Sequence, residues 1–404
     1  AGASSGMAMA HWEIQGWMIL ILGWVFVPFY TRSMVYTMPE FLERRYNPQS
    51  RTILSVISLV SYVLTKVAVT VYAGGLVFQQ VFGIKELWGI DFFWIAAIGL
   101  VVLTALYTIF GGMKSVLYTS VLQTPILLLG SLIILVLGFK ELGGWDEMMR
   151  VCGAVTVNDY GDTMTNLIRS NDDANFPWLG ALIGSAIIGF WYWCTDQFIV
   201  QRVLSGKNEM EARRGTIFGA YLKLLPVFLF LIPGMIAFAL HQKYIGAGGE
   251  GFLPTLANGT ANADAAFPTL VAKLLPAGVK GLVVCGILAA LMSSLASLFN
   301  SSAMLFTIDF YKRFRPETPE KKLVGIGQVA TVVIVILGIL WIPIMRSVGD
   351  VLYTYLQDVQ SVLAPGIAAA FLLGICWKRT SAQGGMWGLI AGMVIGLTRL
   401  GAKV

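Results

Sequence analysis

The sequence has few charged residues, few cysteines and few histidines, and each shortage excludes a class of protein. Only 12% of its 404 residues are charged, about half the share of a soluble globular domain, which argues against a water-soluble enzyme or a nucleic-acid-binding protein. The four cysteines are widely spaced, and two histidines cannot build a histidine-rich metal site. With 57% hydrophobic residues and 44 glycines, the composition predicts an all-α integral membrane protein.

Sequence motifs for nucleotide hydrolysis and hydrolytic catalysis are also missing. The chain contains no G-x-x-x-x-G-K-[ST], no H-E-x-x-H and no G-x-S-x-G pattern. The segment GAGGEG at 246–251 matches G-x-G-x-x-G, but no strand precedes it and no βαβ pattern surrounds it, so we do not interpret it as a dinucleotide site. We therefore expect a secondary transporter or a channel.

The hydrophobic residues fall into ten runs that could cross a bilayer, which requires about 20 mostly apolar residues each. We predict helix breaks at Pro226 and Pro233 in the sixth run and at Pro365-Gly366 in the ninth, because broken membrane helices usually line a cavity. The ten runs are 14–31, 52–82, 90–112, 116–139, 177–200, 215–241, 279–308, 323–345, 351–377 and 383–400.

The distribution of lysines and arginines among the loops predicts how these runs are oriented in the membrane. With segment 32–51 inside, the inside loops, one of them at 113–115, carry twice as many basic residues as the outside loops, as the positive-inside rule requires. Segments 140–176 and 242–278 then become long extracytoplasmic loops. This pattern predicts one transmembrane transporter domain over 1–404, in a plasma membrane and in contact with the lipid bilayer.

The two ends of the chain indicate a piece of a longer protein. The chain opens at Ala1 in a small-residue apolar run, AGASSGMAMA, without a signal-peptide pattern. The run resembles the end of a helix, and the sequence stops as soon as the last hydrophobic run has passed. We therefore expect a fragment.

Ionisable residues inside the hydrophobic runs are candidate functional residues, because a charge in hydrocarbon costs at least about 2.5–3.5 kcal/mol. Glu13 could accept hydrogen bonds from paired sugar hydroxyls, or lie at the interface beside aromatic residues. Lys66 is better explained as a snorkelling or salt-bridged structural lysine. Lys223 lies three residues before a proline, where it either lines a cavity or has a structural role.

Two polar and aromatic clusters are further candidates. FWYWCTDQ at 190–197 places Tyr192 and Trp193 beside Asp196, so aromatic faces for sugar rings would lie next to groups that bind hydroxyls. The alternative is an aromatic belt at a helix end. In YTYLQDVQ at 353–360, Gln357 could bind a polar substrate or join two helices.

A serine-rich stretch, ALMSSLASLFNSSA at 290–303, offers oxygen ligands. Hard cations bind hydroxyl and carbonyl oxygens, and Ser293 and Ser297 face one way at i and i+4, with Ser294 on an adjacent face. The alternative is close helix packing by small residues.

Four segments resemble the sodium/glucose cotransporters of the solute:sodium symporter family, and the likeness runs through nearly the whole chain in order. The segments are TALYTIFGG (104–112), WYWCTDQFIVQRVLS (191–205), GAYLKLLPVFLFLIPGM (219–235) and ILAALMSSLASLFNSSAMLFTIDFY (287–311). The resemblance implies a leucine-transporter-type fold of two five-helix inverted repeats, with substrate and ion near the membrane midplane. The ten runs would be the second to eleventh core helices, so the first core helix would be lacking and a fragment without it would not transport.

The resemblance also implies roles for single residues. The sugar site would contain Glu13, Tyr192 as the inner gate followed by Trp193, Lys223 and Gln357. The sodium site would use Ser293, Ser294 and a carbonyl near Ala290, with its other half on the lacking helix.

Two positions depart from the family pattern. Ser120 stands where members commonly carry an aspartate tied to a second sodium ion, so we expect one sodium per sugar. Gly189 stands where relatives carry a polar sugar contact, which leaves the preferred sugar open. The outside loops lack paired cysteines, which favours a bacterial inner membrane over an animal membrane.

We therefore predict sodium-coupled symport of a hexose, glucose or galactose, by alternating access, with sodium as the coupling ion and no enzyme activity. A sodium symporter for another polyol or a sugar acid, such as myo-inositol, is one alternative. A transporter-like sugar sensor or leak channel is the other. The oligomeric state stays open.

Overall fold

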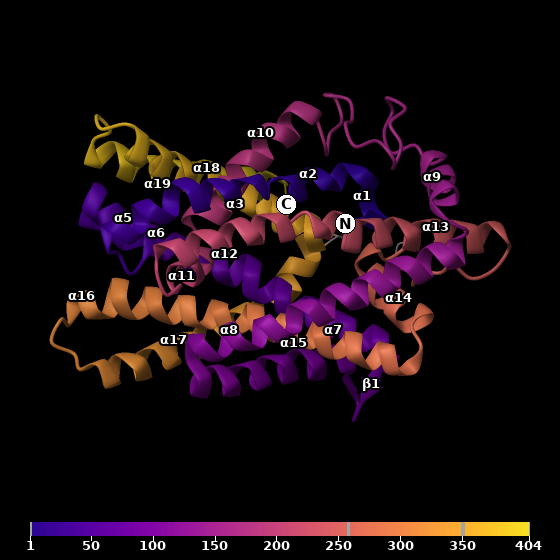
Figure 1. The fold of residues 1–404 in the computed structure, drawn as a ribbon, viewed down its shortest axis with the longest axis horizontal. Coiled ribbons are helices and arrows are strands. Elements are labelled where there is room, and N and C mark those ends of the chain that lie inside the picture. The colour runs from indigo at the N-terminus through magenta and orange to yellow at the C-terminus, as the bar shows by residue number, and fades with distance from the viewer. Residues whose placement is uncertain (1, 257–258, 349–351, 404) are drawn as a thin grey trace.

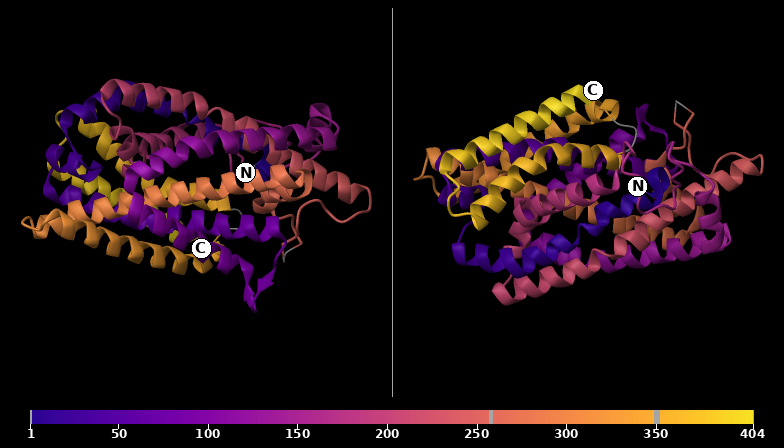
Figure 2. Two further views of the ribbon diagram at one scale, coloured as in Figure 1. Left: turned by 60° about the horizontal axis from the view of Figure 1, so that its bottom comes forward. Right: turned by 90° about the horizontal axis from the view of Figure 1, so that it is seen from above.

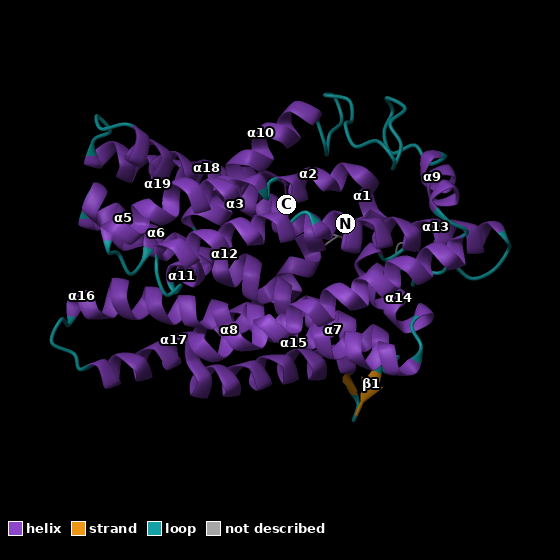
Figure 3. Cartoon of the chain, viewed as in Figure 1, coloured by secondary structure: helices purple, strands orange, loops and turns teal. Residues whose placement is uncertain are grey.

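The computed structural model describes residues 2–256, 259–348 and 352–403. The described residues are almost entirely helical, and most of the long helices lie along the longest axis of the molecule (Figures 1 and 3). One small hairpin interrupts them, in which β1 (Glu86–Leu87) pairs antiparallel with β2 (Ile90–Asp91). The expectation of an all-α membrane protein is confirmed.

Short helical segments make up most of the first third of the chain, because several helices change their hydrogen-bond pattern without ending. The label η marks 3-10 or π segments. The elements are α1 (Gly2–Ser5), η1 (Gly6–Met9), α2 (Ala10–Ile14), α3 (Trp17–Ile21), η2 (Leu22–Phe26), α4 (Val27–Ser33), α5 (Met38–Arg45), α6 (Pro48–Ser61), η3 (Tyr62–Val67) and α7 (Ala68–Phe82).

The remaining elements range from three to 51 residues in length, and the longest of them follow the predicted hydrophobic runs. They are α8 (Phe92–Leu142), α9 (Trp145–Gly153), α10 (Trp178–Gly189), η4 (Phe190–Thr195), α11 (Gln197–Leu204), α12 (Glu209–Leu222), η5 (Val227–Leu231), α13 (Ile232–Gly246), η6 (Ala263–Ala265), α14 (Ala266–Leu274), α15 (Ala277–Met304), η7 (Leu305–Tyr311), α16 (Lys312–Phe314), α17 (Glu320–Val348), α18 (Leu352–Cys376) and α19 (Ala382–Lys403).

Eight helices in the described parts of the chain are long and apolar enough to cross a membrane. The predicted runs 90–112 and 116–139 both fall in α8, and run 383–400 corresponds to α19. The helical membrane architecture is confirmed, whereas the count of ten spans stays a prediction.

The inside loop predicted at 113–115 is wrong, because these residues are helical within α8. Residues 107–116 contain no proline, so every backbone N–H there can continue the helical hydrogen bonding. The adjacent Gly111 and Gly112 weaken the helix but do not end it. Figure 1 places β1 and α9, which flank α8, on the same side of the molecule.

The predicted proline breaks had mixed outcomes. Near Pro226 the helix is interrupted by a turn at residues 223–224 and by η5, and Pro233 lies in the first turn of α13. By contrast, α18 runs through Pro365 without a break. A proline removes only one helical hydrogen bond, and close packing supports the helix here, since a Cβ on Gly366 would lie 3.0 Å from the Cα of Gly392 on α19.

The C-terminal helices α18 and α19 pack side by side, and both appear in yellow at one edge of the molecule in the right view of Figure 2. Helix α18 also packs on α10 and η4. Large side chains such as Tyr30, Tyr62 and Phe371 lie fully buried in the same hydrophobic cluster. The core thus lies around η4, the segment that carries FWYWCTDQ.

Candidate functional site

Three helix interruptions pack together beside this core. Residues Gln15 and Gly16 form a turn between α2 and α3, and Lys223 forms a turn at the end of α12. A Cβ on Gly16 would lie 2.6 Å from the Cγ of Lys223. A Cβ on Gly189, just before η4, would lie 3.0 Å from the Cβ and the Oε1 of Gln15. The α2–α3 turn is therefore held between the other two interruptions.

Glu13 and Lys223 form an ion pair across this junction. Their side chains are 17% and 21% exposed, so the pair is only partly in contact with solvent. The Nζ of Lys223 also lies 5.9 Å from the ring centre of Trp193 on η4. Trp193 in turn meets the ring of Tyr192 edge to face, with ring centres 4.9 Å apart. Four of the five predicted sugar-site residues thus form one connected group.

A cavity of about 330 Å³ opens beside the ion pair. Glu13 and Lys223 lie in its wall with Phe230 and Phe267, so charged and apolar groups face the same space. Larger hollows elsewhere among the described residues contain none of the predicted sugar-site residues. This cavity is the best candidate for a substrate site that the ion pair can reach.

Asp264 also lines the cavity, and sequence reasoning missed it. It lies in η6, within a segment predicted to be a polar outside loop, so its burial gave no signal in the sequence. Burial raises the pKa of the Asp264 carboxyl above its usual value, although a hydrogen bond partly opposes the rise. Its Oδ2 accepts that bond, at 2.9 Å, from the backbone N–H of Leu352 at the start of α18.

The fifth predicted residue, Gln357, is not among the described residues that line this cavity, and neither are Tyr192 and Trp193. Gln357 is 7% exposed and lies on α18, which packs on η4. Its Oε1 has no hydrogen-bond partner among the described residues, and neither has the buried Nε1 of Trp193. Buried polar atoms without partners are rare and need an explanation; a polar ligand is one.

The predicted sodium ligands lie together on α15. Ser293 is 7% exposed, and its Oγ lies 2.5 Å from the Oγ of Ser120 on α8. Ala290 and Ser294 are half-buried on the same helix. The Oγ of Ser297 donates to the backbone carbonyl of Ser293 at 3.0 Å, so this hydroxyl binds within its own helix. The structure therefore brings Ser120 to the serine pair.

Lys66 forms a buried ion pair with Asp196, as the structural interpretation of this lysine predicted. The carboxylate of Asp196 also accepts a hydrogen bond from the Tyr62 hydroxyl at 2.7 Å. Asp196 is therefore occupied by protein groups, although its sequence context suggested that it could bind substrate hydroxyls.

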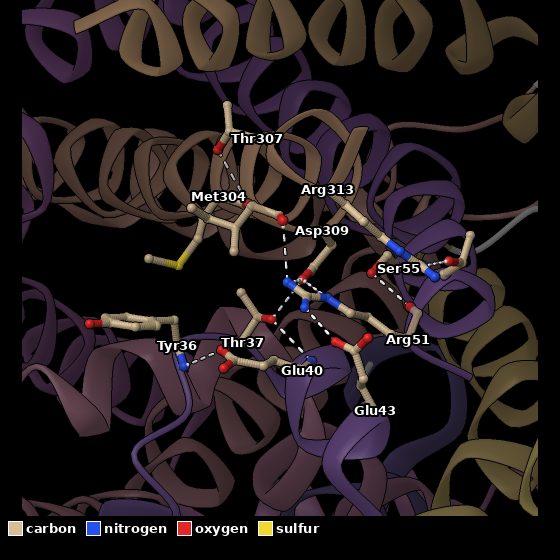
Figure 4. Close-up of polar contacts among 12 residues, drawn as sticks. Tyr36, Thr37, Glu40, Glu43, Arg51, Ser55, Met304, Thr307, Asp309 and Arg313 are labelled. Atoms are coloured by element: carbon tan, nitrogen blue, oxygen red, sulfur yellow. Dashed lines mark hydrogen bonds and ion pairs between the residues drawn. The ribbon is translucent and has the colours of Figure 1, made fainter. Parts of the chain in front are cut away.

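A second buried ionic group, shown in Figure 4, lies away from the predicted residues. The Nε of Arg51 donates to Oδ1 of Asp309 at 2.7 Å, and the Nη1 of Arg51 donates to Glu43 at 2.6 Å. The hydroxyl of Thr37 donates to the same Asp309 oxygen at 2.9 Å. The group ties α5 and α6 to η7. Sequence reasoning missed it, because Asp309 and Arg51 were both counted as loop residues.

Comparison with known proteins decides the family. Residues 1–392 match the Sodium:solute symporter family. The chain belongs to this family. The family is one of transporters rather than enzymes, and its match covers every candidate residue described above.

This member of the family is similar to proteins that are named for two different substrates, myo-inositol and glucose. It is 37% identical over 99% of its length to sodium/myo-inositol cotransporter 2 of Homo sapiens, and it spans 60% of that relative. It is 39% identical to sodium/glucose cotransporter 4 of Homo sapiens, again over 99% of this chain and 60% of the relative. The chain thus spans about three fifths of the length of these relatives.

The fold of this chain is shared with a solved structure of a Na⁺-coupled sialic acid symporter in a substrate-bound, outward-open state. The TM-score is 0.74 at 21% sequence identity, and the match covers 99% of this chain and 84% of the other. At this identity the likeness concerns the fold alone.

Proposed function

We propose that the protein is a sodium-coupled symporter of a hexose, glucose or galactose, that works by alternating access. The observation that carries the proposal is the Glu13–Lys223 ion pair. It lies at interrupted helices, in the wall of a cavity and beside the aromatic residues of η4. Charged groups at such interruptions are typical of transporter substrate sites.

The chemistry of each side chain suits a sugar. The Glu13 carboxylate accepts hydrogen bonds from hydroxyl groups, and the Lys223 ammonium donates to them. The Gln357 amide does both, and its Oε1, which has no hydrogen-bond partner among the described residues, would accept a hydrogen bond from a sugar hydroxyl. Tyr192 and Trp193 offer aromatic faces for the C–H face of the ring, with Tyr192 as the inner gate.

The proposed sodium site consists of the Ser293 and Ser294 hydroxyls and the Ala290 carbonyl. These are the neutral oxygen ligands that a hard cation accepts. A hydroxyl has two lone pairs as well as its proton, so Ser293 can bind a cation while it stays bonded to Ser120. Because Ser120 adds no charge, we propose one sodium ion per sugar.

Coupling requires sodium to prefer the outward-open state, since a ligand shifts an equilibrium only by its differential affinity. We propose the leucine-transporter-type arrangement for this step, with two five-helix inverted repeats that rock against each other. Segments 140–176 and 242–278 would then lie outside a plasma membrane. The lack of paired cysteines in these loops favours a bacterial inner membrane.

A sodium symporter of myo-inositol is the second candidate, because relatives at similar identity are named for myo-inositol and for glucose. Both substrates present a ring of hydroxyls to Glu13 and Lys223, so the site chemistry fits either.

Equilibrium binding to the purified full-length protein in nanodiscs tests the proposal. We expect labelled glucose or galactose to bind in sodium but not in potassium, and an excess of unlabelled glucose, galactose or myo-inositol to rank the substrates. Preferred displacement by myo-inositol would select the second candidate. Equal binding in both salts would contradict coupling and favour a sensor or leak channel.

A further inference from the structure

Asp196 lies at the break between η4 and α11, and protein groups occupy its carboxylate. Oδ2 is paired with the Nζ of Lys66, whose side chain is 7% exposed, while that of Asp196 is 3% exposed. Oδ1 accepts from the Tyr62 hydroxyl at 2.7 Å and from the backbone N–H of Phe198 at 3.0 Å. The second bond caps the first turn of α11. One carboxylate therefore fixes where the helix resumes and binds two side chains of η3.

Aromatic rings surround the Lys66 ammonium on several sides. Its Nζ lies 4.8 Å from the ring centre of Tyr62, 4.9 Å from that of Tyr192 and 4.5 Å from that of Phe198. A cation within about 6 Å of a ring centre is attracted to the ring face, most strongly where water is excluded. Lys66 therefore holds the ring of Tyr192 from one side.

The other side of Tyr192 leads to the substrate cavity. Its ring meets the ring of Trp193, and Trp193 lies over the ammonium of Lys223, which is paired with Glu13 in the cavity wall. A continuous series of contacts thus joins Lys66 to the cavity through the two aromatic residues of η4.

Stability alone does not account for a buried ion pair at this place. Desolvation of two charges offsets most of their attraction, and well-packed apolar residues are often as stable or more so. The pair instead fixes the position of η3 relative to η4, because it joins the two segments at the point where η4 ends. Both segments depart from regular α-helical hydrogen bonding, so neither one alone determines where Tyr192 lies.

We propose that Lys66 and Asp196 are positioning residues that hold Tyr192 in its gating position and join the movement of η3 to that of η4. The inference rests on the proposed sugar symport, with Tyr192 as the inner gate. Neither residue binds sugar. Their loss leaves the binding groups in place but lets the gate ring move.

The double variant Lys66→Met/Asp196→Asn, made in the full-length protein, tests this without leaving an unpaired charge in the membrane. We expect it to insert and to melt near the parent temperature. Its half-saturating sugar concentration should rise about tenfold, and sodium should leak through it without sugar. Lys66→Arg, which keeps the charge, should retain most of the coupling. The control Arg214→Met/Glu211→Gln removes an exposed ion pair of similar type and should behave as the parent.

A double variant with the parent's sugar affinity and no leak would overturn the proposal and leave the pair with a structural role only. Loss of coupling in Lys66→Arg equal to that in the double variant would overturn it as well.

Alkylation of Cys194 gives a readout that needs no transport. Cys194 lies in η4, is fully buried, and its thiol lies 3.5 Å from the Met18 carbonyl. In a background with the other three cysteines replaced by alanine, a membrane-permeant maleimide should label Cys194 several times faster in the double variant than in the parent. Unchanged labelling would contradict a positioning role. If the parent transports no sugar, the proposed function fails while this result still decides whether the pair holds η4.

Discussion

Glu13 and Lys223 neutralise each other, yet each keeps hydrogen-bonding capacity for a ligand. A carboxylate has about four lone-pair sites and an ammonium three protons, and the pair uses one contact between them. Sugar hydroxyls can therefore bind around the pair without separating its charges. This arrangement keeps the site close to neutral when no sugar is bound, which lowers the cost of two charges at membrane depth.

Replacement of Lys223 by methionine should weaken sugar binding by about ten- to a hundredfold, because hydrogen bonds to charged groups contribute about 1.5–3 kcal/mol. The change also leaves Glu13 without its cation. Sodium-dependent binding of labelled sugar measures the effect. The control Lys207→Met alters an exposed loop lysine and should bind as the parent. Parent-like affinity in Lys223→Met would remove this residue from the site.

Replacement of Ser294 by alanine should raise the half-saturating sodium concentration, by about tenfold at most for one neutral ligand. Sugar affinity at saturating sodium should change little. The matched control is Ser301→Ala on the same helix, whose hydroxyl donates to the Ser297 carbonyl and has no proposed ion contact. An unchanged sodium dependence in Ser294→Ala would refute the ligand role, as would an equal effect of both variants.

Helices that change hydrogen-bond pattern without ending are the main feature at the scale of elements. Segments η2, η3, η4, η5 and η7 are π-helical, and π segments are rare and common at functional sites. The contacts of η4 and of the turn before η5 create the candidate site. Motion of these segments changes the site without unfolding a helix.

The ion pair of Arg51 and Asp309 stabilises the junction of α6 and η7. Arg51→Met leaves the fully buried Asp309 side chain without its cation, a loss of about 3–5 kcal/mol for buried pairs, so the melting temperature should fall clearly. Arg51→Met/Asp309→Asn should regain most of the loss, because no unpaired charge remains. Thermal unfolding in detergent measures both variants. A single variant as stable as the parent would contradict this role.

The segment 156–176 should lose stability in acid. Burial alone would raise the pKa of Asp173, but hydrogen bonds from the backbone N–H groups of Phe176 and Asn175 and from the Asn158 amide, together with Arg169, lower it overall. A carboxyl with a lowered pKa contributes stability above the unfolded pKa of about 3.9, and this is lost as the pH falls through the folded pKa. The protection of the segment against hydrogen exchange, relative to the intrinsic exchange rate at each pH, should therefore fall below about pH 4.

Asp173→Asn is the comparison for this acid dependence. The variant should exchange faster than the parent at neutral pH, and its exchange should depend less on pH in the acid range. Equal acid dependence in parent and variant would assign the effect to other groups, such as Asp162. Hydrogen bonds from the Asn158 side chain and the Ser170 backbone lower the pKa of Asp162.

At the scale of the whole molecule, hydrophobic runs predicted most of the helices, because lipid-exposed segments must be apolar along their length. Glu13, Lys223 and Tyr192 could be selected because a charge or an aromatic cluster stands out in such a run. The helical residues 113–115 of α8 and the helix through Pro365 could not be selected in this way. At Pro365 the packing of Gly366 against α19 supports the helix despite the proline.

The burial of Asp264 and of Asp309 could not be predicted from the sequence either. Each lies in a segment that looks like a polar loop, and its burial depends on a partner far away in the chain: the start of α18 for Asp264 and Arg51 for Asp309. Charge patterns near helix ends favour solvent exposure, and only long-range contacts reverse that expectation.

Uptake of labelled glucose and galactose by the full-length protein in liposomes tests the central claim most directly, with an inward sodium gradient compared with a potassium gradient. The account predicts that one of the two sugars accumulates above its outside concentration in sodium only, and that Tyr192→Ala abolishes this while inserting normally. Equal uptake in both salts, or accumulation that survives Tyr192→Ala unchanged, would contradict it.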